Sequence, residues 1–164
     1  MSKPNILVIQ ADQLTALCLQ AYGTPYALTP HMDRIAARGT TYLNSYCNSP
    51  VCGPSRASMM TGRLPSNVGV YDNAGEFLSS EPTYAHYLRT LGYQTSLVGK
   101  MHFVGPDQLH GFERRLTTDI YPSDFSWTAD WSQYEEEYAP SRMSLLSVVE
   151  AGTCERSLQV DYDD

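Results

Sequence analysis

The sequence has 164 residues, of which 42% are hydrophobic and 18% are charged. This composition excludes a disordered or fibrous chain and suits one ordinary domain with a buried core. Eleven Lys and Arg residues against 18 Asp and Glu give a formal net charge of −7, the wrong sign for neutralising nucleic-acid phosphates, so we expect no nucleic-acid partner. No stretch reaches transmembrane length and the N-terminus has no secretory pattern, so we expect a cytoplasmic protein that does not bind a membrane and keeps its cysteines as thiols.

The start of the chain predicts a strand, a helix and a second strand. Residues 5–10 are apolar without alternation, which is typical of a strand buried on both faces of a sheet. Thr29 is a suitable N-cap, Pro30 suits the first turn of a helix, and Gly39 is a suitable end. Residues 40–46 form the second predicted strand.

The next part of the chain predicts two helices and one strand. A loop containing Pro and Gly leads into a short helix over residues 55–61. Another helix begins at residues 82–83, ends at Gly92 and is followed by a strand over residues 94–98. This order predicts an α/β domain with a mainly parallel sheet flanked by helices.

The predicted sheet also indicates where a ligand would bind. Parallel sheets bind ligands beyond the carboxyl ends of their strands. Four polar residues fall there by this interpretation: Asp12, Cys52, Lys100 and His102. We expect residues 1–112 to form the α/β core, and residues 113–164 to be an irregular aromatic and acidic segment. About three strands are fewer than a sheet usually has, so the predicted sheet is incomplete.

Cys52 is the first candidate for chemistry. It lies at or just before the N-terminus of a predicted helix, and Arg56 follows four residues later. Both features are typical of reactive cysteines. The alternative is a small buried residue in a turn.

The sequence around Cys52 resembles the signature of the sulfatase family. The signature reads Cys52-x-Pro54-x-Arg56, and Thr-Gly-Arg follows at residues 61–63. Two other elements of the family are matched in the same order along the chain. Asp12 follows the first predicted strand, and residues 99–102 resemble the family's Gly-Lys-x-His element.

The resemblance implies a fold like that of alkaline phosphatase and the hydrolysis of a sulfate ester. In this family a maturation enzyme oxidises the signature cysteine, here Cys52, to Cα-formylglycine, whose hydrate attacks sulfur. Arg56 is expected to hold this hydrate or its alkoxide. Lys100 and His102 are expected to contact the sulfate or the leaving oxygen, with His102 as a proton donor.

The resemblance also implies a divalent cation, usually Ca²⁺ and alternatively Mn²⁺ or Mg²⁺. Asp12 and the modified Cys52 would be ligands. Gln13 stands where many sulfatases have a second Asp, so it offers at most a neutral carbonyl oxygen. The family's Asp-Asn ligand pair belongs to a later segment that this sequence does not contain. Without the resemblance, Asp12 would be interpreted as a turn residue.

Within the family, the chain is most similar to the choline sulfatase branch. The resemblance runs over residues 70–77, 82–86, 99–113 and 116–122. Asn73 matches a substrate-contacting Asn and Trp127 a Trp that binds the quaternary ammonium, although composition alone favours a packed core aromatic for Trp127. The branch usually has His-Asn where Met-Ser stands at residues 143–144. The resemblance implies choline sulfate as substrate and allows a homo-oligomer.

Several alternatives remain open at this point. A phosphonate monoester or phosphodiester hydrolase of the same superfamily can use the same nucleophile. Because the resemblance covers the N-terminal part of a longer enzyme, residues 1–164 are expected to be part of a catalytic domain and inactive in isolation, or else a truncated remnant. His86 is expected to be an ordinary helix residue, and His110 is assigned no role.

Overall fold

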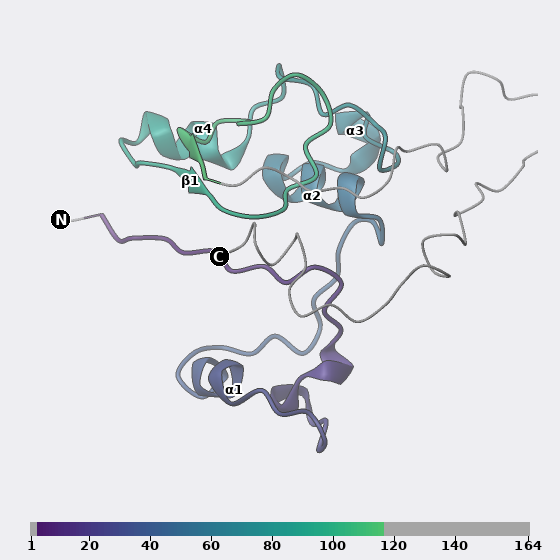
Figure 1. Cartoon of the computed structure of the whole chain (residues 1–164), viewed down its shortest axis with the longest axis vertical. Coiled ribbons are helices and arrows are strands. Elements are labelled where there is room, and N and C mark those ends of the chain that lie inside the picture. The colour runs from purple at the N-terminus through teal and green to yellow at the C-terminus, as the bar shows by residue number, and fades with distance from the viewer. Residues whose placement is uncertain (1–2, 117–164) are drawn as a thin grey trace, which may run out of the picture. The chain divides into compact units, whose positions relative to one another are not determined.

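The computed structural model describes residues 3–116 (Figure 1). The chain divides into two compact units, residues 1–46 and residues 47–164. Trp127 and residues 117–164 of the irregular aromatic and acidic segment predicted over residues 113–164 lie outside the described residues. None of the helices within residues 3–116 is long and apolar enough to cross a membrane.

The first unit contains three short helical segments. Two 3-10 helices, η1 (Ala16–Cys18) and η2 (Gln20–Tyr22), precede the helix α1 (Pro30–Ala36). Pro30 occupies the first turn of α1, as the sequence predicts, because its missing N–H and fixed φ suit that position. The α-helix stops at Ala36, and the chain continues through turns to Gly39, so the predicted helix is confirmed with an earlier end.

The two strands predicted in this unit do not form. Residues 5–10 and 40–46 have no strand hydrogen bonding, and the side chains from Ile6 to Ile9 are 58–84% exposed. A strand that is buried on both faces needs a neighbouring strand and helices that cover the sheet. The described residues of this unit provide neither, and the prediction of two strands is wrong for them.

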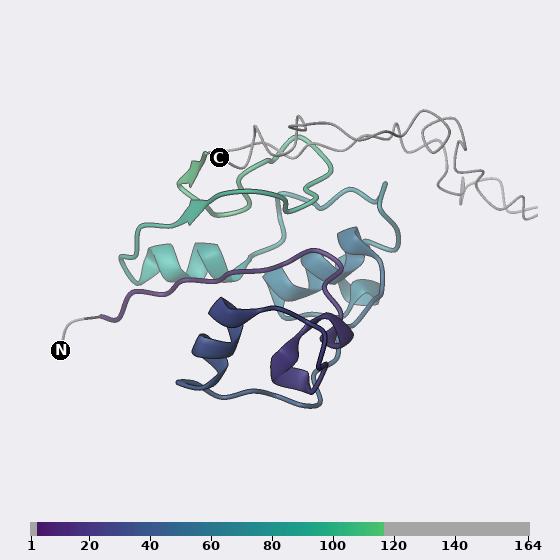
Figure 2. The same ribbon diagram turned by 60° about the horizontal axis from the view of Figure 1, so that its bottom comes forward.

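The described part of the second unit, residues 47–116, contains three helices. They are α2 (Cys52–Thr61), α3 (Pro65–Val68) and α4 (Tyr84–Thr90), and α2 contacts both of the others (Figure 2). The helix predicted over residues 55–61 is confirmed and begins three residues earlier, at Cys52. At the start of α4, the Thr83 side chain accepts a hydrogen bond from the main-chain N–H of His86, and the His86 side chain accepts one from the main-chain N–H of Thr83. This reciprocal pair confirms His86 as a structural helix residue.

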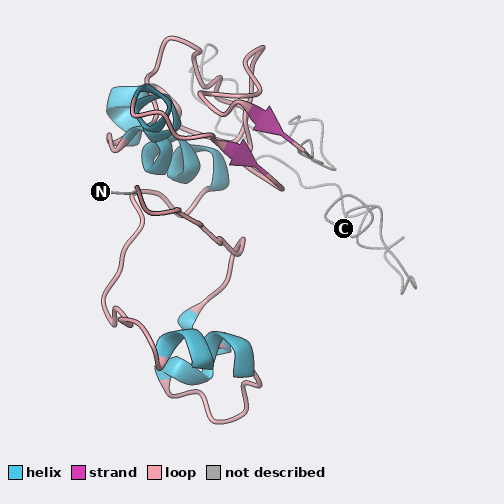
Figure 3. Cartoon of the chain, turned by 90° about the vertical axis from the view of Figure 1, so that its left-hand side faces the viewer, coloured by secondary structure: helices cyan, strands magenta, loops and turns pink. Residues whose placement is uncertain are grey.

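Two short strands form a parallel pair. β1 (Ser96–Leu97) lies within the predicted strand over residues 94–98, and β2 (Arg114–Arg115) pairs with it in the register Ser96↔Arg114. The sequence does not predict β2, because two adjacent arginines show no apolar alternation. Figure 3 shows the helices of this unit on one side of the two strands, an arrangement that agrees with a parallel sheet flanked by helices.

The hydrophobic core of the second unit lies between α2, α4, β1 and the loop after β1. Its buried residues are Ala57, Met60, Val68, Val70, Phe77, Ala85, Leu97, Met101, Phe103 and Phe112. The N-terminus of α2 and the segment over residues 99–102 therefore share one core, although they are far apart in the sequence. This packing fixes the position of the residues that the sequence analysis selects for chemistry.

Candidate active site

Cys52 is the first residue of α2, at the point where the extended chain turns into the helix. The next residue, Gly53, donates its main-chain N–H to Oδ1 of Asn73 at 2.8 Å. A Cβ atom at Gly53 would lie only 3.0 Å from the main-chain oxygen of Asp72. The first turn of α2 therefore packs tightly against residues 72–73, and a Cβ atom at position 53 would require its neighbours to move by a few tenths of an ångström.

Lys100 meets Cys52 across 48 positions of sequence. Nζ of Lys100 lies 3.8 Å from Sγ of Cys52, within hydrogen-bonding distance for sulfur. Both residues are half-buried. The ammonium group thus lies beside the atom that the sequence analysis identifies as the precursor of the nucleophile.

Arg56 is buried, with 5% of its surface exposed. Its Nη1 atom donates a hydrogen bond to the main-chain oxygen of Lys100 at 2.5 Å and lies 3.6 Å from Sδ of Met101. A guanidinium has several donors in a fixed plane, so a single side chain can hold a loop in one position. Arg56 thus connects α2 to the segment that carries Lys100 and His102.

His102 is buried and has a left-handed backbone, with φ of 57°. Its Nε2 atom donates to the main-chain oxygen of Asn73 at 2.7 Å. A non-glycine residue in this conformation costs of the order of 1–3 kcal/mol and persists only where its surroundings hold it. The hydrogen bond to Asn73 and the packing of the neighbouring Met101 and Phe103 provide that support.

The second unit thus brings together five of the residues that the sequence selects. Cys52 and Arg56 come from α2, Lys100 and His102 from the loop after β1, and Asn73 from the loop between α3 and α4. The side-chain oxygen of Asn73 accepts a hydrogen bond from Gly53 in the first turn of α2. The predicted contact of Asn73 with substrate stays a prediction.

The predicted metal ligands Asp12 and Gln13 belong to the first unit. Both are exposed residues of a turn, and Gln13 has a φ of 55°. Among residues 3–116, no group of three or more His, Cys, Asp or Glu side chains is placed to hold a metal ion. Calcium takes six to eight oxygen ligands, so the described residues do not by themselves form a calcium site.

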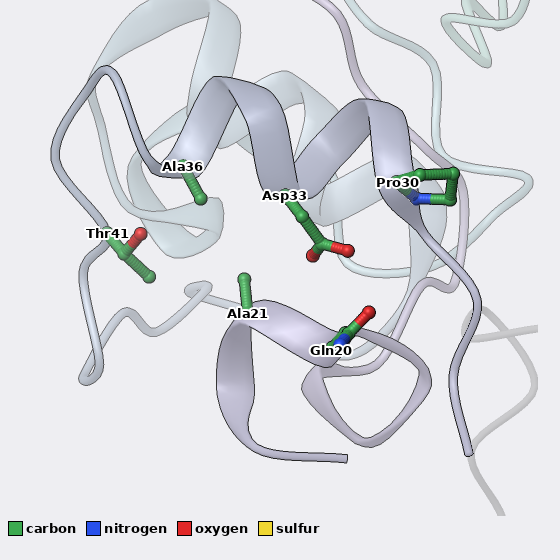
Figure 4. A pocket seen from close by; sticks show the side chains of 6 residues that line it. All are labelled: Gln20, Ala21, Pro30, Asp33, Ala36 and Thr41. Atoms are coloured by element: carbon green, nitrogen blue, oxygen red, sulfur yellow. The ribbon is translucent and has the colours of Figure 1, made fainter. Parts of the chain in front are cut away.

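A shallow pocket in the first unit does not involve the predicted site residues. It lies between η2 and α1 (Figure 4), and the Asp33 carboxylate on its wall accepts a hydrogen bond from Thr29. Its lining residues are Gln20, Ala21, Pro30, Asp33, Ala36 and Thr41. It supplies no arrangement of nucleophile, base and cation.

His110 is the buried residue to which the sequence analysis assigns no role. Its ring is completely buried, stacks on Phe77 with the ring centres 4.1 Å apart, and meets Phe103 edge-on at 4.5 Å. Neither ring nitrogen has a hydrogen-bond partner among the described residues. The stacked rings support Phe103, the neighbour of His102. No local sequence pattern predicts this stacking.

The titration of His110 depends mainly on this burial. Burial lowers the pKa of His110, and the Asp107 carboxylate, 3.7 Å from Nδ1, opposes that effect. Burial has the opposite effect on the Asp107 carboxyl group and raises its pKa. Hydrogen bonds from the main-chain N–H groups of His110 and Leu109 outweigh this effect, so the pKa of Asp107 is lowered. His110 is therefore stabilised in its neutral form.

Comparisons with known proteins show which proteins this chain is similar to. The family model described as Sulfatase matches residues 4–150. The chain is 52% identical to a choline-sulfatase of Rhizobium meliloti over 162 residues, covering 99% of this chain and 32% of that protein. It is 40% identical to arylsulfatase A of Bos taurus over 127 residues, covering 70% of this chain and 25% of that protein.

Two solved structures are similar in fold. One is a protein in complex with its substrate D-glucosamine-2-N,6-O-disulfate, with 36% identity and a TM-score of 0.66 over 70% of this chain and 23% of that one. The other is a phosphonate monoester hydrolase of Agrobacterium radiobacter, with 27% identity and a TM-score of 0.61 over 70% of this chain and 26% of that one.

The chain thus spans about a third of the choline-sulfatase and about a quarter of the arylsulfatase that it matches. The predicted fold class, a parallel α/β architecture like that of alkaline phosphatase and the sulfatases, is confirmed by these similarities. The matched region includes the Cys-x-Pro-x-Arg signature on α2 and the Gly-Lys-x-His element after β1. This chain belongs to the sulfatase family.

Proposed function

We propose that this chain carries the nucleophile and the anion-binding residues of an enzyme that hydrolyses choline sulfate to choline and sulfate. The observation that carries the proposal is the contact between Nζ of Lys100 and Sγ of Cys52 at 3.8 Å. A sulfate ester is negatively charged, so an ammonium group beside the nucleophile lowers the cost of bringing the two together.

We propose that a maturation enzyme converts Cys52 to formylglycine. One hydroxyl of its hydrate attacks sulfur while the S–O bond to choline breaks and choline leaves with a proton. The second hydroxyl then gives up its proton, the carbonyl is restored, and the bond from carbon to the sulfate oxygen breaks to release sulfate. Lys100 binds the sulfate oxygens at that position, and Arg56 holds the Lys100 segment through its main-chain oxygen. His102 takes up or releases a proton beside the reacting groups.

The choice of choline sulfate rests on similarity to the choline-sulfatase of Rhizobium meliloti, which is high over 99% of this chain. We propose that Asn73 contacts the sulfate group and that Trp127, outside the described residues, contacts the quaternary ammonium through its aromatic face. A phosphonate monoester is the second candidate substrate, because the phosphonate monoester hydrolase of Agrobacterium radiobacter has a similar fold.

The proposed cofactor is a divalent cation, Ca²⁺ in preference to Mn²⁺ or Mg²⁺. Asp12 and residue 52 in its modified form would be ligands, with Gln13 as a further neutral oxygen donor. The cation would supply positive charge that offsets the negative charge of the sulfate.

The wider setting is also proposed from the resemblance. Residues 1–164 would be the N-terminal part of a catalytic domain, with an α/β core over residues 1–112 followed by the irregular segment over residues 113–164. The protein would act in the cytoplasm without a nucleic-acid or membrane partner, and would form a homo-oligomer.

The test is made on the full protein that carries this chain, produced together with a formylglycine-generating enzyme. Sulfate release from choline sulfate is measured alongside turnover of a phosphonate monoester, and mass spectrometry identifies residue 52. We expect formylglycine at that position, preferential turnover of choline sulfate, and no turnover in Cys52→Ala. Cys47→Ala is the matched control, because Cys47 is an exposed free thiol five residues away.

Retained turnover in Cys52→Ala would refute the nucleophile assignment. Faster turnover of the phosphonate monoester than of choline sulfate would replace the proposed substrate with the second candidate.

A further inference from the structure

Asn73 contacts the nucleophile turn and His102 through two different atoms. Its side-chain Oδ1 accepts from the main-chain N–H of Gly53 at 2.8 Å. Its main-chain oxygen accepts from Nε2 of His102 at 2.7 Å. Asn73 is only 6% exposed, so both hydrogen bonds are shielded from water. One residue therefore connects the first turn of α2 with the segment that carries Lys100 and His102.

Both partners of Asn73 are in constrained positions. Gly53 approaches the main chain of residues 72–73 so closely that a Cβ atom would lie 3.0 Å from the Asp72 oxygen. His102 has a φ of 57°, which a histidine adopts only where neighbouring contacts hold it. The two hydrogen bonds of Asn73 hold Gly53 and His102 in these constrained positions. Asn73 therefore positions both residues.

The second hydrogen bond determines the tautomer of His102. A main-chain oxygen can only accept, so Nε2 carries the proton. In a neutral imidazole the lone pair then belongs to Nδ1. Any proton that His102 takes up is bound at Nδ1, and any proton that the resulting imidazolium passes on leaves from the same atom.

We propose that Asn73 is a positioning residue: its side chain holds the turn that carries residue 52, and its main-chain oxygen fixes His102 with Nδ1 as the nitrogen that exchanges protons. The second half of this inference rests on the proposed function, in which His102 moves a proton. The first half and the tautomer itself do not require any turnover. The test therefore distinguishes failure of this inference from failure of the proposed function.

The tautomer is tested by nitrogen NMR of the full protein labelled at histidine. The His102 signals are assigned by their loss in His102→Gln. In the neutral ring we expect a protonated Nε2 and an unprotonated Nδ1. When the ring takes up a proton, the chemical shift of Nδ1 should change more than that of Nε2. A protonated Nδ1 beside a bare Nε2 in the neutral ring would overturn the proposal, whether or not the protein hydrolyses any sulfate ester.

The role of the side chain is tested with two substitutions. Asn73→Ala removes the acceptor for the Gly53 N–H, whereas Asn73→Asp retains one. We expect faster hydrogen exchange of the Gly53 amide in Asn73→Ala and exchange close to wild type in Asn73→Asp. With choline sulfate, Asn73→Ala is expected to lower kcat by about tenfold, the effect of one lost buried hydrogen bond, with a smaller change in KM.

A different result would contradict the positioning role of the side chain. If Asn73→Ala raises KM, leaves kcat unchanged and leaves the Gly53 amide as protected as in wild type, Asn73 acts only as a substrate contact. Asn73→Asp is compared through amide exchange, since its added charge also repels an anionic substrate.

Discussion

Nη1 of Arg56 lies 2.5 Å from the main-chain oxygen of Lys100, a residue 44 positions further along the chain. Arg56 comes from the middle of α2, and Lys100 carries the ammonium group that reaches Cys52 at the start of the same helix. The guanidinium therefore holds the main chain of Lys100 in place, while the side chain of Lys100 reaches the thiol of Cys52. A substitution at either residue is expected to affect the other through this connection.

Arg56→Ala is expected to destabilise the full protein by about 1–3 kcal/mol, because it removes a charged donor from a buried carbonyl and leaves a gap in the packing. Arg56→Lys is expected to lose less, since it keeps one donor but not the planar group. Urea unfolding measures both. The matched control is Arg63→Ala, which removes an ion pair with the half-buried Glu81 and a hydrogen bond to the main-chain oxygen of Asn67, and which is expected to cost about 1 kcal/mol because Arg63 itself is exposed. Equal losses for Arg56→Ala and Arg63→Ala would show that the buried contact is unimportant.

Lys100→Met is expected to reduce kcat for choline sulfate by about 100- to 1000-fold, in the range found when one charge-stabilising group is removed from an active site. Its effect on the free energy of unfolding should be small, because Lys100 is half-buried. The measurement is steady-state kinetics of sulfate release. Lys3→Met serves as control, as Lys3 is the other lysine in this sequence and is exposed. An unchanged kcat in Lys100→Met would remove Lys100 from the reaction.

Gly111→Ala is expected to be strongly destabilising, by about 3 kcal/mol or more. Gly111 has a φ of 96°, and a Cβ atom there would lie 2.6 Å from Nδ1 and 2.7 Å from the main-chain N of His86, so strain and steric overlap add. Gly69→Ala is the control: its φ is 82°, but nothing lies within 4 Å of the added atom, and strain alone should cost about 1 kcal/mol. Thermal or urea unfolding compares them, and similar losses would contradict the contact with His86.

The buried ring of His110 predicts a pH dependence of stability. Because burial lowers its pKa in the folded protein, the unfolded chain binds a proton more readily. The free energy of unfolding should therefore be highest above the ordinary histidine value of about 6.5 and fall as the pH decreases below it. His86 and Arg115 also lower the pKa of His110, whereas Asp107 raises it.

Two variants isolate this effect in urea unfolding between about pH 5 and 8. His110→Phe keeps an aromatic ring against Phe77 and should flatten the pH dependence in that window. Asp107→Asn removes the carboxylate that favours protonated His110, so the decrease in stability should become larger. A pH dependence that is the same in His110→Phe as in wild type would assign it to other groups.

The sequence alone determined the helices α1, α2 and α4 and the position of the Cys-x-Pro-x-Arg signature. The starts and ends of α1, α2 and α4 depend on neighbouring residues, such as Pro30 in a first turn and Gly62 after a last one. The Cys-x-Pro-x-Arg signature is also local, and it identified the family before any contact was known. These signals are readable because capping and backbone preference act within one or two turns.

Only the tertiary structure decided which residues meet and which predicted strands form. Residues 5–10 carry a strong strand pattern and yet form no strand among the described residues, because pairing requires a neighbour that local sequence cannot supply. In the same way, Arg114 and Arg115 form a strand without a strand pattern, since β1 offers them hydrogen bonds. The contacts of Asn73 with Gly53 and His102 span 20 and 29 positions, and they depend on the packing of the shared core.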